Sequence, residues 1–241
     1  QHGRSGDEPA ATGDGVHESG KEEEQTEYEE YAQQGIPAYG VILGDNITNY
    51  SAANTSAWRD DILPGLALSK TPMFSVFGNH DCIFFNSDNR LSTDARSSTF
   101  NLKVQREFEE MFGPVNYSFN RGDVHIVCMR DIIYTTNYSG GKYKYGFTNE
   151  QLAWLEADLK SVSIDKTVVL CVHIPMQERD TSDDDEAEGE EEFVRVDKIW
   201  ELLYGYDEAH ILSGHTHRNT PCIHKAEDGT EIYEHTISAI R

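Results

Sequence analysis

Four apolar segments of the sequence end in residues that could bind a metal or transfer a proton. Segment 73–77 runs into Gly78-Asn79-His80-Asp81, and segment 39–43 runs into Gly44-Asp45. Segments 168–172 and 209–213 end in the same manner. The polar side chains at these ends are Asp45, Asn79, His80, Asp81, His173, His215 and His217. Carboxylate, amide and imidazole groups without a Cys among them suit a hard or borderline divalent metal rather than a structural zinc site.

Each of these segments is predicted to be a buried β-strand, because it is a short apolar run bounded by turn-forming residues. Open α/β sheets place their active sites at the carboxyl ends of strands. The turn Asn79-His80-Asp81 alone would fit an ordinary polar turn, and its agreement with three other strand ends is what favours a site. The sequence therefore predicts an α/β fold, with residues 36–77 as a right-handed βαβ unit.

Helices are predicted between the strands at 21–34, 56–69 and 101–112, after Thr148, and at 193–204. Thr148 and Gln151 have the spacing of a capping box, which marks the start of a helix. Pro64-Gly65 interrupts the second helix, so a kink or two short helices are expected there. A hairpin at 117–129, a loop at 134–147 and a final strand at 231–238 complete the prediction.

The acidic charge of the chain is concentrated in two segments. The formal net charge is −23 over 241 residues. Residues 1–31 hold ten acidic residues against two basic ones, and residues 178–192 hold ten against one. Such segments bury too little apolar surface to fold alone, so 1–20 is predicted to be disordered or a loop, and 178–192 a mobile insertion. An acidic chain also argues against a tightly held nucleic acid, which needs basic surface.

The remainder, 21–241, is long enough to bury one full core and is predicted to be a single domain. The sequence opens on Gln1 and stops in apolar sequence at Ile240-Arg241, so we expect truncation at both ends and a further C-terminal domain. No apolar run reaches the roughly 18 residues that a transmembrane helix needs. The compartment is left open, with a secreted or periplasmic location as one option.

Four cysteines, at 82, 128, 171 and 222, show no C-x-x-C spacing. Cys128 and Cys171 stand inside apolar strand segments and are expected to be buried thiols. Whether Cys82 and Cys222 form a disulfide cannot be decided from spacing and stays open.

Taken in order, the four strand-end motifs resemble those of the calcineurin-like metallophosphoesterase superfamily, in particular its bacterial phosphoesterases. The motifs are Gly44-Asp45, Gly78-Asn79-His80-Asp81, His173 and Gly214-His215-Thr216-His217. The resemblance covers about residues 21–241. It implies a β-sheet sandwich flanked by helices, in four α/β/β/α layers, and hydrolysis of phosphate mono- or diesters by a metal-activated water.

The resemblance also implies a dinuclear centre with two divalent ions, which could be Mn, Fe, Zn or Mg. Asp45 would bridge both ions, because a carboxylate has two acceptor oxygens. Asn79, His173 and His215 would complete the site of one ion, and His217 would bind the other. Two such ions clamp a phosphoryl group and supply a hydroxide near neutral pH.

Two further residues would act on the substrate rather than on the metal. His80 would lie over the phosphate as general acid or charge stabiliser, and Asp81 would orient it. The substrate would be a phosphate-ester small molecule or a phosphorylated macromolecule, since the fold does not specify the leaving group.

One part of the family pattern has no counterpart where it is expected. The pattern begins with an Asp-x-His on a first strand, and no Asp-x-His precedes the helix predicted at 21–34. Asp14-Gly15-Val16-His17 has the wrong spacing. Two ligands of the ion assigned to His217 are therefore missing, through truncation, omitted residues or true loss. The alternative function is a non-catalytic, metal-poor relative that binds a phosphate ligand or a partner.

Overall fold

The computed structural model describes residues 38–47, 56, 58–69, 71–81, 98–133, 144–176 and 195–239. The chain divides into two compact units, Gln1–Tyr39 and Gly40–Arg241, and the second contains every element named below. The predicted boundary at residue 20, the predicted helix 21–34 and the acidic insertion 178–192 lie outside the described residues.

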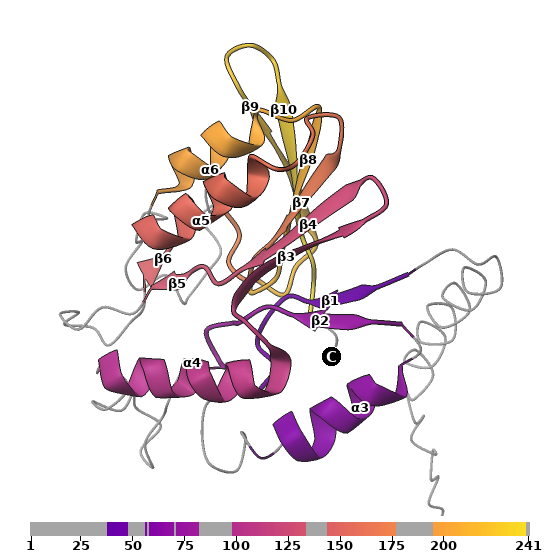
Figure 1. The fold of residues 1–241 in the computed structure, drawn as a ribbon, viewed down its shortest axis with the longest axis vertical. Coiled ribbons are helices and arrows are strands. Elements are labelled where there is room, and N and C mark those ends of the chain that lie inside the picture. Colours follow the sequence, from indigo (N-terminus) through magenta and orange to yellow (C-terminus); the bar gives the residue numbers. More distant parts are fainter. Residues whose placement is uncertain are drawn as a thin grey trace, which may run out of the picture. The chain divides into compact units, whose positions relative to one another are not determined.

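A six-stranded sheet forms the larger layer of the fold, in the order β3-β4-β7-β8-β10-β9 (Figure 1). Its strands are β3 Asn116–Arg121, β4 Val124–Met129, β7 Thr167–Cys171, β8 Glu208–Ser213, β9 Thr220–Lys225 and β10 Glu231–Thr236. The four central strands are parallel to one another, and β3 and β9 pair antiparallel at the two edges. Parallel strands buried on both faces appear in a sequence as nearly continuous apolar runs, which is why β4 and β7 were predictable.

The smaller sheet consists of two parallel strands, β1 Gly40–Ile42 and β2 Met73–Ser75. Between them the chain forms a π-helical turn, η1 Trp58–Ile62, followed by helix α3 Leu63–Leu68. Pro64 lies at the start of α3, where its missing N–H costs no helical hydrogen bond. Of the two expected outcomes, a kink or two short helices, the structure shows two short helical segments that follow each other directly.

A further pair of very short strands corrects the prediction of a loop at 134–147. Strand β5 Ile132–Ile133 pairs antiparallel with β6 Lys144–Tyr145, so the end of that region is extended and paired. Two-residue strands carry no periodic pattern that a sequence could display. The pairing matters because β6 ends beside the candidate site described below.

Helices α5 Asn149–Leu159 and α6 Val196–Leu203 cover one face of the six-stranded sheet (Figure 1). The expected capping box is present, since Thr148 accepts the N–H of Gln151 and the Gln151 side chain accepts the N–H of Thr148. Leu152, Leu155 and Leu159 are buried against the apolar side chains of β4, β7, β8 and β10. This packing forms the main core.

The smaller sheet packs on the opposite face of the larger one. Phe74 of β2 stacks on Phe119 of β3 with ring centroids 4.1 Å apart. Phe119 pairs with Ile126 and therefore points away from Val127, which faces α5 and α6.

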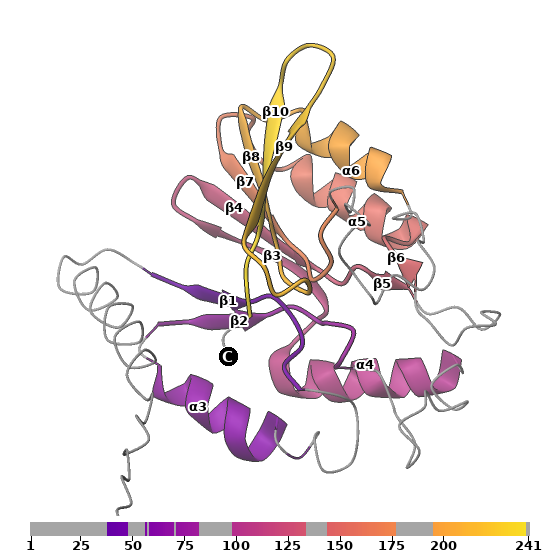
Figure 2. The ribbon, with the colours of Figure 1, turned by 180° about the vertical axis from the view of Figure 1, so that it is seen from behind.

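A second core beneath the smaller sheet gathers side chains from η1, the segment after β2 and helix α4 Ser98–Phe112. The ribbon of α4 is seen from behind in Figure 2. It includes Trp58, Phe77 and Phe108. The predicted α/β/β/α layering is thus confirmed. Among the described residues, no helix is long and apolar enough to cross a membrane.

Candidate metal centre

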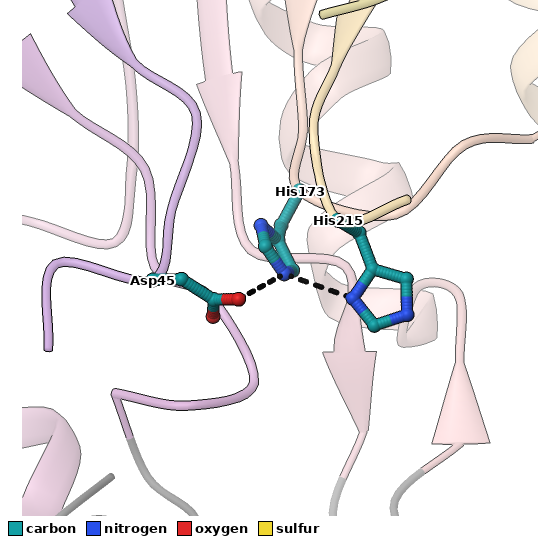
Figure 3. Close-up of side chains that lie close together, drawn as sticks. All are labelled: Asp45, His173 and His215. Carbon is teal, nitrogen blue, oxygen red and sulfur yellow. Dashed lines mark hydrogen bonds and ion pairs between the residues drawn. The ribbon is translucent and has the colours of Figure 1, made fainter. Parts of the chain in front are cut away.

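The chain segments that leave β1, β2, β7 and β8 bring four of the predicted ligands together. Nε2 of His173 lies 2.8 Å from Oδ1 of Asn79 and 3.3 Å from Oδ2 of Asp45. Nδ1 of His215 lies 3.1 Å from the same Asn79 oxygen and 3.2 Å from Nε2 of His173. Figure 3 shows the side chains of Asp45, His173 and His215 converging from separate elements.

The chemistry of this donor set fits a divalent metal. Metal–ligand bonds of 2.0–2.2 Å place neighbouring ligand atoms about 3.0–3.4 Å apart, close to the separations found here. Nδ1 of His173 lies 2.7 Å from the carbonyl oxygen of Leu43, which can only accept, so this nitrogen carries the proton. In the neutral ring Nε2 then presents a lone pair to the oxygens of Asn79 and Asp45, which are acceptors too. A cation bound between these atoms would accept a lone pair from each of them.

The backbone at these positions is strained, as is common at functional sites. Of the four described non-glycine residues with positive φ, three are predicted ligands: Asp45 at 55°, His215 at 66° and His217 at 57°. Gly78 allows the strand ends to approach, because a Cβ there would lie 2.2 Å from the backbone nitrogen of Asp45. These strained backbone conformations therefore set the directions in which the side chains point.

Electrostatics couple Asp45 to His173. Burial alone would raise the pKa of Asp45, but the hydrogen bond and charge of His173, together with the charge of His80, hold it below its ordinary value. Burial would lower the pKa of His173, yet Asp45 and Asp131 raise it above its ordinary value. The opposite shifts of the two pKa values share one main cause, the short contact between the Asp45 carboxylate and the His173 ring.

Asp81 closes the turn that carries Asn79 and His80. Its Oδ2 accepts the N–H of Gly78 at 2.8 Å and the side-chain amide of Asn46 at 3.0 Å. Burial raises the pKa of Asp81 to about 7. The backbone N–H of His80 donates to Oδ1 of Asp45 at 2.9 Å, so the turn is tied directly to a ligand. The expectation that Asp81 orients the His80 ring stays a prediction.

His217 differs from the other predicted ligands. Its side chain is exposed, and the cluster of possible metal-binding groups among the described residues consists of Asp45, His173 and His215. The structure therefore assembles the ligands assigned to one ion, and the assignment of His217 to a second ion stays a prediction.

The sequence does contain one Asp-x-His, Asp123-Val124-His125, at the turn between β3 and β4. Both ring nitrogens of His125 are engaged there, with Asp158 at 2.8 Å and Asn120 at 3.1 Å. These contacts join the hairpin to α5. This motif is a structural link and does not supply the missing ligand pair.

Two further residues lie beside the cluster: Asp131, which sequence reasoning missed, and Tyr145, which belongs to the region 134–147, where the tyrosines could line a substrate groove or be ordinary loop residues. Oδ2 of Asp131 accepts the N–H of Ile174 at 2.6 Å, and the Asp131 carbonyl accepts the N–H of Gly146 at 2.7 Å. Tyr145 places its ring 6.1 Å from that of His215, at 65°. Asp131 follows the apolar strand β4 by two residues, so treating that strand end like the other four would have found it.

A family model described as calcineurin-like phosphoesterase matches residues 13–219. The chain belongs to the calcineurin-like phosphoesterase family. Comparison with curated proteins gave no significant match. Since the matched residues contain all four strand-end motifs, the assembled ligands lie within the family's homologous region.

Two solved structures are similar to this calcineurin-like phosphoesterase. The purple acid phosphatase PPD1 from yellow lupin (Lupinus luteus) seeds aligns with a TM-score of 0.54 and 15% identity, over 88% of this chain and 40% of that one. The phosphopantetheinyl hydrolase PptH from Mycobacterium tuberculosis aligns with a TM-score of 0.44 and 15% identity, over 84% and 80% of the respective chains. The chain thus spans about 40% of the length of the lupin protein. At this identity the likeness to the lupin protein concerns the fold alone.

Proposed function

We propose that the protein is a metal-dependent phosphoesterase that hydrolyses phosphate mono- or diesters with a metal-activated water at a dinuclear centre. The observation that carries this proposal is the convergence of acceptor atoms from Asp45, Asn79, His173 and His215, delivered by four separate strand ends. Membership of the calcineurin-like phosphoesterase family supports the same class of reaction.

Asp45, Asn79, His173 and His215 would hold the first ion, and Asp45 and His217 would contribute to the second. When bound, two divalent ions polarise a phosphoryl oxygen and lower the pKa of a bound water to about 7. Oxygen and imidazole ligands suit Mn, Fe, Zn or Mg. The positive charge would also reverse the local potential of an acidic protein toward a phosphate.

The residues of the chain itself would orient the substrate and move its proton. His80 is partly exposed, and its backbone N–H donates to Asp45, so its side chain starts next to the ligands of the proposed centre. From there it would donate a proton to the leaving oxygen. Asp81 would hold the turn in place through Gly78 and Asn46. The substrate would be a phosphate-ester small molecule or a phosphorylated macromolecule.

Hydrolysis assays with two generic substrates test the proposal. The 241-residue chain loaded with Mn²⁺ should hydrolyse p-nitrophenyl phosphate or bis(p-nitrophenyl) phosphate, and EDTA should abolish the activity until Mn²⁺ is restored. His173→Ala should abolish both metal binding and hydrolysis, whereas His125→Ala, which removes a buried histidine outside the cluster, should retain both. A Mn²⁺-loaded chain that cleaves neither ester would contradict the proposal.

Among the described residues, the cluster of possible metal-binding groups consists of Asp45, His173 and His215, enough for one ion. This favours a second candidate, a non-catalytic relative that keeps the fold and binds a phosphate ligand or a partner. Metal stoichiometry separates the two. A catalytic dinuclear centre should bind two Mn²⁺ per chain. One ion or fewer, together with inorganic phosphate binding and no hydrolysis, would support the non-catalytic candidate.

A further inference from the structure

The segment that carries His173 away from β7 is held by two buried carboxylates. The last sheet-like bond of this segment joins the His173 carbonyl to the N–H of Gly214 at 3.0 Å. Beyond it the Ile174 N–H donates to Asp131 at 2.6 Å, and the Met176 N–H donates to Oε1 of Glu234 at 2.7 Å. Residue 175 between them is proline and has no N–H. Both amide donors that the segment offers are therefore bound by carboxylates.

Glu234 is anchored in its turn. It belongs to β10, is completely buried, and points to the side of the sheet that α5 and α6 cover. Its second oxygen, Oε2, lies 2.7 Å from Nε2 of His224 on β9. The His224 ring stacks on Trp200 of α6, with centroids 4.2 Å apart and planes 26° from parallel. Both carboxylate oxygens thus have partners, and the partner histidine is itself held between β9 and α6.

Burial of the Glu234 carboxylate lowers the stability of the fold and gives no advantage if the side chain only fills space. A fully buried carboxylate must be desolvated, and an apolar side chain of similar volume commonly stabilises such a position at least as well. What an apolar side chain cannot do is fix the backbone N–H of Met176, three residues after a metal ligand. Partners of this kind set the orientation of a metal-binding histidine and thereby tune metal affinity.

We propose that Glu234 is a positioning residue of the metal centre. Held by His224, its carboxylate fixes Met176, and together with Asp131 it sets the direction in which the strand end presents His173. This inference rests on the proposed function, because it concerns how one ligand of that centre is oriented.

Co²⁺ binding to the full chain tests the inference, measured by calorimetry and by the visible absorption of the bound ion, which reports the ligand geometry. Glu234→Ala should weaken Co²⁺ binding by about 10- to 100-fold and alter the spectrum. Glu234→Gln keeps an oxygen for the Met176 N–H and should restore affinity to within about threefold of wild type. Glu231→Ala is the matched control, since Glu231 lies on the same strand but pairs with Lys225 at the surface, and it should change neither readout.

A folded Glu234→Ala chain that binds Co²⁺ with wild-type affinity and spectrum would overturn the inference, as would an equal loss in Glu231→Ala. If Glu234→Ala does not fold, Co²⁺ binding to His224→Ala tests the positioning role instead. It leaves the acceptor for Met176 but frees Oε2, and should weaken Co²⁺ binding about threefold or more; unchanged binding would refute the positioning role. A wild-type chain that binds no Co²⁺ would overturn the proposed function as well, whereas the other failures overturn this inference alone.

Discussion

Replacing Gly78 by alanine should damage the metal centre without altering a ligand. A Cβ at Gly78 would lie 2.2 Å from the backbone nitrogen of Asp45 and 2.3 Å from its Oδ1. Gly78 is not among the glycines with positive φ, so the added methyl group, and not an unfavourable backbone angle, is the perturbation. The substitution therefore acts directly on the distance between two strand ends.

The size of the effect follows from these contacts. Real Cβ atoms essentially never approach another heavy atom closer than 3.0 Å, so Gly78 and Asp45 must separate by at least about 0.8 Å. A displacement close to 1 Å in a catalytic constellation can cost about 10²-fold in activity. Overpacking of a tight contact costs about 1–3 kcal/mol of stability. We expect Gly78→Ala to weaken Mn²⁺ binding by about 10- to 100-fold and to lower the free energy of unfolding by about 1–3 kcal/mol.

Calorimetric titration with Mn²⁺ and urea unfolding of the metal-free chain measure the two effects separately. Gly65→Ala is the matched control, because a Cβ at this helical position would meet no heavy atom within 4 Å beyond its chain neighbours and the backbone of its own helix. It should leave Mn²⁺ binding unchanged and stabilise the chain by about 0.5–1 kcal/mol. Wild-type Mn²⁺ affinity in Gly78→Ala, or a loss of affinity shared with Gly65→Ala, would refute the reasoning.

Three further substitutions test other parts of the account. His80→Asn should lower the turnover of an aryl phosphate by about 10²- to 10⁴-fold with unchanged metal stoichiometry, and a matching loss of metal would disprove the role of proton donor. Trp58→Ala removes a buried ring packed edge-on against Phe108 at 5.9 Å; urea unfolding should show a loss of about 3–5 kcal/mol, and a loss below about 1 kcal/mol would contradict its place in the core. Thr148→Ala should cost about 0.5–2 kcal/mol in the same assay, with Thr148→Ser restoring most of it, because a hydroxyl caps the Gln151 N–H.

The strand ends of the site could be predicted because local sequence determines them. Parallel strands covered on both faces are mostly apolar, so β7 stands out as a Val- and Leu-rich run, whereas β8 is marked by a shorter apolar pair, Ile211-Leu212. The polar residues directly after them, His173 and His215, then mark the edge at which parallel strands end together. The capping box at Thr148 is equally local, and it fixed the start of α5 to the residue.

Other features depend on contacts that no local pattern encodes. Strand β9 contains Pro221, which is tolerated because β9 is an edge strand paired only with β10 among the described strands. Met176 and Glu234 are separated by 58 residues, and Ile174 and Asp131 by 43. An isolated Glu within a strand looks like an ordinary surface residue until the sheet order places it over the segment that carries His173.

The most direct test of the central claim is anomalous X-ray scattering from crystals of the chain loaded with Mn²⁺ or Zn²⁺. We expect an anomalous peak about 2.0–2.2 Å from four atoms: Oδ2 of Asp45, Oδ1 of Asn79, Nε2 of His173 and Nδ1 of His215. A metal-loaded crystal with no peak among these four atoms, or with peaks only at other acidic residues, would contradict the central claim.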